Sequence, residues 1–162
     1  MHFINLDTGT DQLLAQKRAG VGVITLSRPK AKNALSPKLS PALRKMIQQM
    51  GEDDDIGAVI ITGAGKAFCA GGDVKGMGIS RGPVLTADQR LSRLLEGQRQ
   101  LTGALVSLRK PVIAAIPGPA VGAGLSLALA CDIRIGSLSS FVTTGYARVG
   151  LSGDYGISSL LT

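Results

Sequence analysis

Two glycine-rich turns, each directly after an apolar segment, are the part of the sequence best suited to chemistry. Residues 63–73 read GAGKAFCAGGD and follow the apolar run 59–62, while residues 117–124 read PGPAVGAG and follow 111–116. Glycine adopts backbone angles that other residues avoid, and it lets a ligand approach the main chain closely. Two such turns can direct two backbone N–H groups at one oxygen atom, and this arrangement stabilises an oxyanion.

Three familiar glycine- or serine-based motifs do not fit these turns. A P-loop requires G-x-x-x-x-G-K-[ST], but Ile60 stands where its first glycine should be. The dinucleotide-binding pattern G-x-G-x-x-G fails at both turns, because Phe68 and Leu127 occupy the third glycine position. Ser126 lies in GLSLA rather than in G-x-S-x-G. Nucleotide hydrolysis, hydride transfer and serine hydrolysis therefore lose support.

The composition is that of one globular domain. The 162 residues are 44% apolar, which is enough to build a core. The net charge of +7 would suit a phosphorylated small molecule or a nucleic acid. Runs of Lys and Arg never exceed two residues, however, and only 3% of residues are aromatic, so a nucleic acid is an unlikely partner.

Signals for metals, disulfides, secretion and membranes are weak. Cys69 and Cys131 lie in different motifs and His2 is the single histidine, so we predict no disulfide, no metal site and no histidine-dependent triad. The N-terminus lacks a basic region followed by an apolar stretch. The uncharged span 111–131 is long enough to cross a membrane, but two prolines near its middle would break a helix. We expect a soluble cytoplasmic protein without membrane association.

The elements that position the two turns follow from the spacing of apolar residues. Strands are predicted over 3–6, 12–17, 21–26, 57–62, 112–116, 132–135 and 141–143. Helices are predicted from Ser36 to Gly51, over 87–108, over 123–130 and from 157 onwards. The helix over 87–108 is expected to turn six leucines inward: Leu91, Leu94, Leu95, Leu101, Leu105 and Leu108. Alternating strands and helices predict an α/β fold with a largely parallel sheet.

Four segments together resemble one known family. KAFCAGGDV (66–74) and KPVIAAIPGPAVGAGLSLALACDIR (110–134) resemble the signature segments of the enoyl-CoA hydratase/isomerase (crotonase) family, and 24–36 and 141–156 extend the resemblance. The resemblance implies a crotonase-like α/β spiral of ββα units, with residues 1–162 as its core domain, assembled into homotrimers or hexamers. Family members are longer, so we expect a truncated form that lacks the C-terminal helical region.

The resemblance also implies where an acyl-CoA thioester would bind. The backbone N–H groups of Gly72 and Ala123 would hold the thioester oxygen, and the unpaired amides at the positive end of a helix agree with this role for Ala123. Lys32, Ala70 and Lys75 resemble positions that contact coenzyme A. Coenzyme A would arrive as part of the substrate, so no separate cofactor is expected.

Family hydratases use two glutamates, and neither is present here. Ser126 stands at the first position, and Gly145 or Tyr146 at the second. Asp154, in GLSGDYG, matches a position used as a base or nucleophile in several branches of the family, although an aspartate there could equally cap a helix. A single base favours an isomerase-type double-bond shift. The alternatives are a hydratase with displaced carboxylates and a non-catalytic acyl-CoA- or RNA-binding member.

Overall fold

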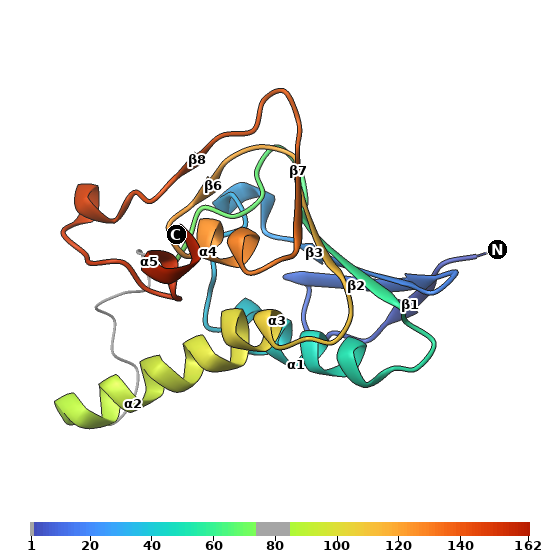
Figure 1. The fold of residues 1–162 in the computed structure, drawn as a ribbon, viewed down its shortest axis with the longest axis horizontal. Helices are drawn as coiled ribbons and strands as arrows, with labels where there is room; N and C mark the ends of the chain where they lie inside the picture. The colour runs from blue at the N-terminus through green and yellow to red at the C-terminus, as the bar shows by residue number, and fades with distance from the viewer. Residues whose placement is uncertain (1, 74–84) are drawn as a thin grey trace.

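The protein, described by a computed structural model over residues 2–73 and 85–162, is built around a mostly parallel sheet (Figure 1). Six strands are neighbours in the order β1 (Ile4–Leu6), β2 (Leu13–Arg18), β3 (Val21–Leu26), β4 (Ala58–Gly63), β5 (Val112–Ile116) and β7 (Ile133–Gly136). A second small sheet pairs β6 (Ala120–Val121) with β8 (Val142–Thr143). The first two pairings are antiparallel, whereas β3, β4, β5 and β7 run parallel. The predicted α/β class is confirmed.

Helices and helical turns connect the strands. They are the turn Pro29–Ala31, α1 (Leu39–Glu52), α2 (Ala87–Gln98), the π-helical turn Arg99–Gly103, α3 (Ala104–Val106), α4 (Ala123–Leu129), the turn Tyr146–Val149 and α5 (Ile157–Leu160). Figure 1 shows α1 and α3 together on one side of the six-stranded sheet, while α4 lies next to β6. Strands β4 and β5 are parallel neighbours, and one glycine-rich turn follows each of them. The two turns therefore begin at the same edge of the sheet.

Helix α1 forms the centre of the core because its apolar residues recur at helical spacing. The buried residues on this face are Leu39, Leu43, Met46, Ile47 and Met50. They pack against β2, β3 and α3. The Ser36 hydroxyl accepts a hydrogen bond from the Leu39 amide at 3.0 Å, so it satisfies one unpaired donor at the start of the helix. Helix α1 thus begins at Leu39, three residues after the predicted start, and Ser36 contacts its first amide from outside the helix.

The prediction that all six leucines between 87 and 108 face inward is wrong. Leu91, Leu94 and Leu95 are 54%, 47% and 46% exposed, whereas Leu101 and Leu105 are buried. Figure 1 shows the cause, since α2 extends beyond the body of the molecule. The apolar periodicity continues through the whole segment, but packing against α1 is concentrated in the π-helical turn and α3, together with Gly97 at the end of α2, which lies against Arg44.

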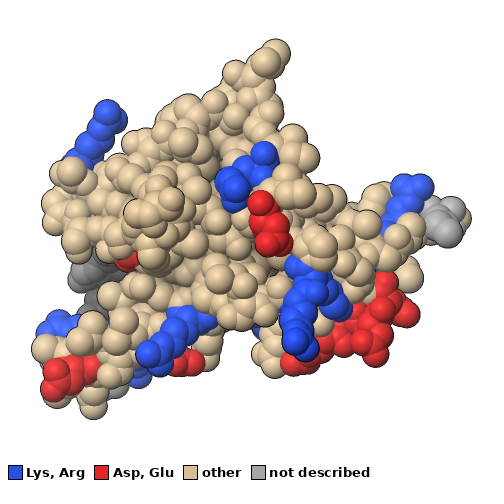
Figure 2. Space-filling model, in the orientation of Figure 1, with Lys and Arg blue, Asp and Glu red and all other residues tan. Residues whose placement is uncertain are grey.

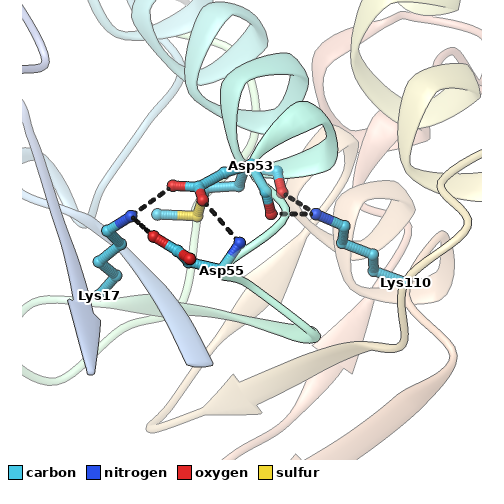
Figure 3. Close-up of polar contacts among 5 residues, drawn as sticks. Lys17, Asp53, Asp55 and Lys110 are labelled. Atoms are coloured by element: carbon cyan, nitrogen blue, oxygen red, sulfur yellow. Dashed lines mark hydrogen bonds and ion pairs between the residues drawn. The ribbon is translucent and has the colours of Figure 1, made fainter. Parts of the chain in front are cut away.

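A polar cluster fastens the end of α1 to two other elements (Figure 3). The ammonium group of Lys17, on β2, pairs with Asp53 at 2.8 Å and with Asp55 at 3.1 Å. From the other side, Lys110 donates to the carbonyl oxygens of Met50 at 2.9 Å and Asp53 at 2.6 Å. A lysine at this position satisfies carbonyl groups that the end of the helix leaves free.

Charge is dispersed on the face shown in Figure 2. Its Lys and Arg side chains stand in separate places rather than in one stripe, and the largest group of its acidic side chains lies near the end of α1. That region of the sequence reads EDDD over 52–55. Within residues 2–73 and 85–162, no helix combines the length and apolar character needed to cross a bilayer.

Candidate active site

The two glycine-rich turns pair with each other along their backbones. The Val121 amide donates to the Cys69 carbonyl at 2.9 Å, and the Phe68 amide donates to Pro119 at 3.0 Å. On its other side the first turn pairs with Leu35, whose amide donates to Gly71 at 2.8 Å and whose carbonyl accepts from Asp73 at 3.0 Å. The first turn is therefore held between a preceding loop and the second turn.

Close packing explains why glycine occupies the point where the turns meet. Gly71 has a φ of +91°, a left-handed conformation that glycine adopts without strain. A Cβ atom there would lie only 2.8 Å from the Val121 carbonyl oxygen and 3.5 Å from the Ala123 amide nitrogen. Gly124, in the first turn of α4, lies against the carbonyl group of Cys69 in the same way. Larger residues would push the two turns apart.

The amides of Gly72 and Ala123 are both placed to act as donors. In the parallel bridge between Leu35 and Gly72, the groups on either side of Gly72 make the bonds, so the N–H of Gly72 itself points away from Leu35. Ala123 is the first residue of α4, where an amide has no acceptor within its own helix. In the part of the chain described, neither amide donates to a backbone carbonyl of a turn or loop.

Both residues line a cavity of about 580 Å³. Its walls come from the loop over 28–34, the two glycine-rich turns and the segment 144–154. Ala70 also lines this cavity, together with Tyr146 and Asp154. The three residues predicted to be catalytic, Gly72, Ala123 and Asp154, thus line one cavity, and their catalytic roles remain predictions.

The Asp154 side chain is engaged by a tyrosine rather than by a helix end. The Tyr146 hydroxyl donates to Asp154 Oδ1 at 2.6 Å. Helix α5 begins after Gly156, and its N-cap makes no side-chain hydrogen bond, so the carboxylate of Asp154 does not cap it. Ser126, fully buried in α4, donates to the Asp154 carbonyl at 3.2 Å. The residue in place of the first family glutamate therefore fixes the backbone of Asp154.

The surroundings of the Tyr146 phenol determine whether it is protonated. Burial, together with the hydrogen bond to Asp154, raises the pKa of the Tyr146 phenol to about 12. The phenol consequently stays protonated near neutral pH and can only donate to the carboxylate. The sequence placed Tyr146 only as one of two residues that could stand at the second glutamate position, and it did not indicate the contact with Asp154.

Asn33 and Arg28 support the cavity from the preceding loop, and sequence reasoning missed both. The buried side chain of Asn33 donates to the carbonyls of Ala64 at 3.0 Å and Ala67 at 2.8 Å, and it accepts from the Arg28 amide at 2.8 Å. The Arg28 guanidinium pairs with Asp73 at 2.9 Å. The sequence feature that could have indicated these two residues is the polar loop RPKAKN (28–33), which directly precedes the apolar Ala34.

The three residues predicted to contact coenzyme A differ in their placement. Ala70 lies in the cavity wall. Lys32 is exposed and follows the helical turn Pro29–Ala31 in a left-handed conformation, and the lysine that lines the cavity among the described residues is Lys30. Lys75 lies outside the described residues. Lys30 is therefore a further cationic residue at the cavity that the sequence did not single out.

The two cysteines do not contribute a nucleophile. Cys69 and Cys131 are both buried and unpaired with each other. Burial raises the pKa of each thiol to about 12, so the reactive thiolate is scarce near neutral pH. Cys69 instead lies at the bridge between the two glycine-rich turns.

Comparison with known proteins identifies the family. The sequence model of the enoyl-CoA hydratase/isomerase family matches residues 16–162. The chain is 40% identical to a Mycobacterium tuberculosis (strain ATCC 25618 / H37Rv) protein named probable enoyl-CoA hydratase EchA14, over 93% of this chain and 57% of that protein. The chain belongs to the enoyl-CoA hydratase/isomerase family.

Solved structures agree with this assignment. An enoyl-CoA hydratase from Polaromonas sp. JS666 superposes with a TM-score of 0.82 at 34% identity, covering 93% of this chain and 57% of that one. An enoyl-CoA hydratase/carnithine racemase from Magnetospirillum magneticum gives a TM-score of 0.83 at 29% identity, covering 94% and 56%. The crotonase-like fold is therefore confirmed, and the chain spans little more than half the length of these relatives.

Proposed function

We propose that the protein binds an acyl-CoA thioester and catalyses an isomerase-type shift of its carbon–carbon double bond. The observation that supports this proposal is that Gly72, Ala123 and Asp154 line the same cavity. Oxyanion donors and one base suffice for this reaction. The assembly into homotrimers or hexamers and the cytoplasmic location remain predictions.

The proposed reaction begins with a 3-enoyl thioester whose carbonyl oxygen accepts hydrogen bonds from Gly72 and Ala123. Asp154 removes a proton from C2, and the electron pair of the broken C–H bond forms an enolate with negative charge on that oxygen. The two amides stabilise this charge as it develops. The proton then returns from Asp154 to C4, so the double bond moves to C2–C3 and the carboxylate is regenerated.

The positive side chains near the cavity suit the phosphates of coenzyme A. Arg28 and Lys30 line the cavity wall, although Arg28 is partly neutralised by Asp73. The predicted contacts of Lys32, Ala70 and Lys75 remain part of this proposal. Lys30 is added to them, because it lines the same cavity as Ala70 and carries a charge that phosphate groups attract.

Hydration of a 2-enoyl thioester is a second candidate, since relatives such as EchA14 are named enoyl-CoA hydratases. Among the described residues, the carboxylates in the cavity wall are Asp73 and Asp154, and Asp73 is paired with Arg28. One carboxylate without an ion pair, that of Asp154, is enough to move a proton between two carbons. The hydration mechanism of the family uses two carboxylates, so the cavity supports it less well. A non-catalytic acyl-CoA- or RNA-binding role is a third candidate.

Incubation with 3-enoyl-CoA and 2-enoyl-CoA in separate reactions distinguishes the candidates. We expect interconversion of the two without a hydroxyacyl product, and a loss of at least 100-fold in Asp154→Asn. Accumulation of hydroxyacyl-CoA would favour hydration, and an unchanged rate in Asp154→Asn would remove Asp154 from the mechanism. Binding of a short RNA with a steep salt dependence and no binding of CoA would favour the third candidate.

A further inference from the structure

We propose that Tyr146 is a positioning residue that occupies Oδ1 of Asp154 and thereby leaves Oδ2 as the oxygen that takes and returns the substrate proton. This inference rests on the proposed function and adds to it the working atom of the base. It also gives a role to one of the two residues, Gly145 and Tyr146, that could stand where a family hydratase carries its second glutamate.

The geometry supports this division of labour between the two carboxylate oxygens. Tyr146 begins a helical turn, Tyr146–Val149, that is bounded by left-handed glycines at Gly145 and Gly150. This turn brings the phenol back to Asp154, where the 2.6 Å separation is that of a strong O–H···O⁻ hydrogen bond. An oxygen engaged in such a bond is a poorer proton acceptor, so the second oxygen is the better base.

Ser126 holds the backbone of the same residue. Its hydroxyl, fully buried in α4, donates to the Asp154 carbonyl, and α4 is also the helix that begins with Ala123. Helix α4 therefore carries the proposed oxyanion donor at its first residue, Ala123. About one turn later it carries Ser126, which contacts the backbone of the proposed base. With the backbone held by Ser126 and the side chain by Tyr146, Asp154 keeps a fixed position relative to the Ala123 amide.

Among the residues that the structure describes, the other charged residues that line the same cavity are Arg28, Lys30 and Asp73. Asp73 is neutralised by Arg28 at 2.9 Å. Tyr155, adjacent to Asp154 in sequence, is the natural control because it is also partly buried and, in the described structure, does not bond to the Asp154 carboxylate. The chain contains two tyrosines and no tryptophan, so the phenols dominate its near-ultraviolet absorbance.

A titration of tyrosinate absorbance tests the contact without substrate. In a Tyr155→Phe background, Tyr146 is the single phenol, and its pKa of about 12 reflects burial and the bond to Asp154. Adding Asp154→Asn removes the carboxylate, so the titration midpoint should fall by about one pH unit. Asp53→Asn, which removes a distant carboxylate, should leave the midpoint unchanged. An equal midpoint in the presence and absence of the Asp154 carboxylate would overturn the proposed contact.

Kinetics of the full chain test the positioning role. Tyr146→Phe should lower kcat about 10-fold with KM changed less than about twofold, because the base loses its orientation while the substrate site remains. Tyr155→Phe should retain the original kcat, and both variants should have similar thermal midpoints. If Asp154→Asn is inactive and Tyr146→Phe retains full kcat, the positioning role is wrong and the proposed function stands. If Asp154→Asn retains full activity, the proposed function itself fails.

Discussion

The Cα atom of Gly124 in α4 packs directly against the backbone carbonyl of Cys69, so that a Cβ atom at this position would overlap the carbonyl oxygen. This contact sets the spacing between the two glycine-rich turns. It joins α4, which begins with Ala123, to the turn that contains Gly72. The distance between the amides of Gly72 and Ala123 therefore depends on the absence of a side chain at Gly124.

Gly124→Ala should destabilise the protein by about 2 kcal/mol or more, because neither backbone can yield without disturbing the hydrogen bonds that join the turns. Chemical denaturation monitored by circular dichroism measures this change. Gly103→Ala is the matched control, since Gly103 is also helical but has room for a Cβ atom, with its nearest neighbour at 3.7 Å. That control should be neutral or stabilise by up to about 1 kcal/mol. Equal effects of the two substitutions would contradict the packing argument.

Ala123→Pro should remove one oxyanion donor with little effect on the helix. Ala123 is the first residue of α4, a position where proline is tolerated because its missing N–H makes no intrahelical bond. We expect kcat for the double-bond shift to fall by about 10²–10³. Ala123→Gly keeps the N–H and should retain most of the activity. A proline variant that folds and keeps its full kcat would exclude this amide from the mechanism.

Asn33→Ala should destabilise the protein by about 3 kcal/mol, because it leaves buried backbone groups without partners. Asn33 bonds to Ala64, Ala67 and Arg28, and its own φ of +57° is one that asparagine tolerates better than alanine. Lys32→Ala is the control, since Lys32 has a similar φ of +49° but an exposed side chain. Urea unfolding of both variants separates the lost hydrogen bonds from the backbone conformation.

Stability should depend on pH through the Lys17–Asp53 pair. The hydrogen bond from Lys17 lowers the pKa of Asp53 below 3.8, and the bond to Asp53 raises the pKa of Lys17 above 10.5. The carboxylate contribution is therefore complete above about pH 4 and is lost as the pH falls through the lowered pKa. The lysine contribution is complete below about pH 10 and is lost as the pH rises through the raised pKa.

Lys17→Met should reduce the dependence of stability on pH at both ends of this range. Thermal midpoints measured from acid to alkaline pH should converge with those of the original protein at the two extremes, where the pair is broken in both. Lys38→Met, at an exposed position before α1, should leave the pH dependence unchanged. A constant difference between Lys17→Met and the original protein at every pH would show that the pair does not account for the effect.

The order of strands and helices could be predicted because each element carries its own local pattern. The continuous apolar run that forms β4 and the helical spacing of Leu39, Leu43 and Met46 are readable without tertiary information. The exposure of Leu91 and Leu95 was not readable in this way. Amphipathic spacing indicates which side of a helix is apolar, but how far the helix extends beyond the sheet depends on the whole fold.

The site was predictable to the extent that its chemistry lies in the backbone. Glycines after buried strands indicate where amides can approach a ligand, and both turns were found at the cavity. Two contacts depend on residues in the left-handed conformation, such as Gly145 and Lys32. These contacts are the hydrogen bond from Tyr146 to Asp154 and the hydrogen bonds of the Asn33 side chain. Such residues reverse the chain locally, and no periodic pattern reports which side chains they bring together.

The burial of Cys69 offers a chemical reporter of motion in the site. Its thiol is shielded at the bridge between the two turns and has a pKa of about 12, so alkylating reagents can reach it only when that bridge opens. The rate of alkylation at Cys69, relative to Cys131 just after the C-terminal end of α4, would therefore measure how often the two turns of the candidate oxyanion site separate. A bound acyl-CoA that joins the two turns should slow this reaction.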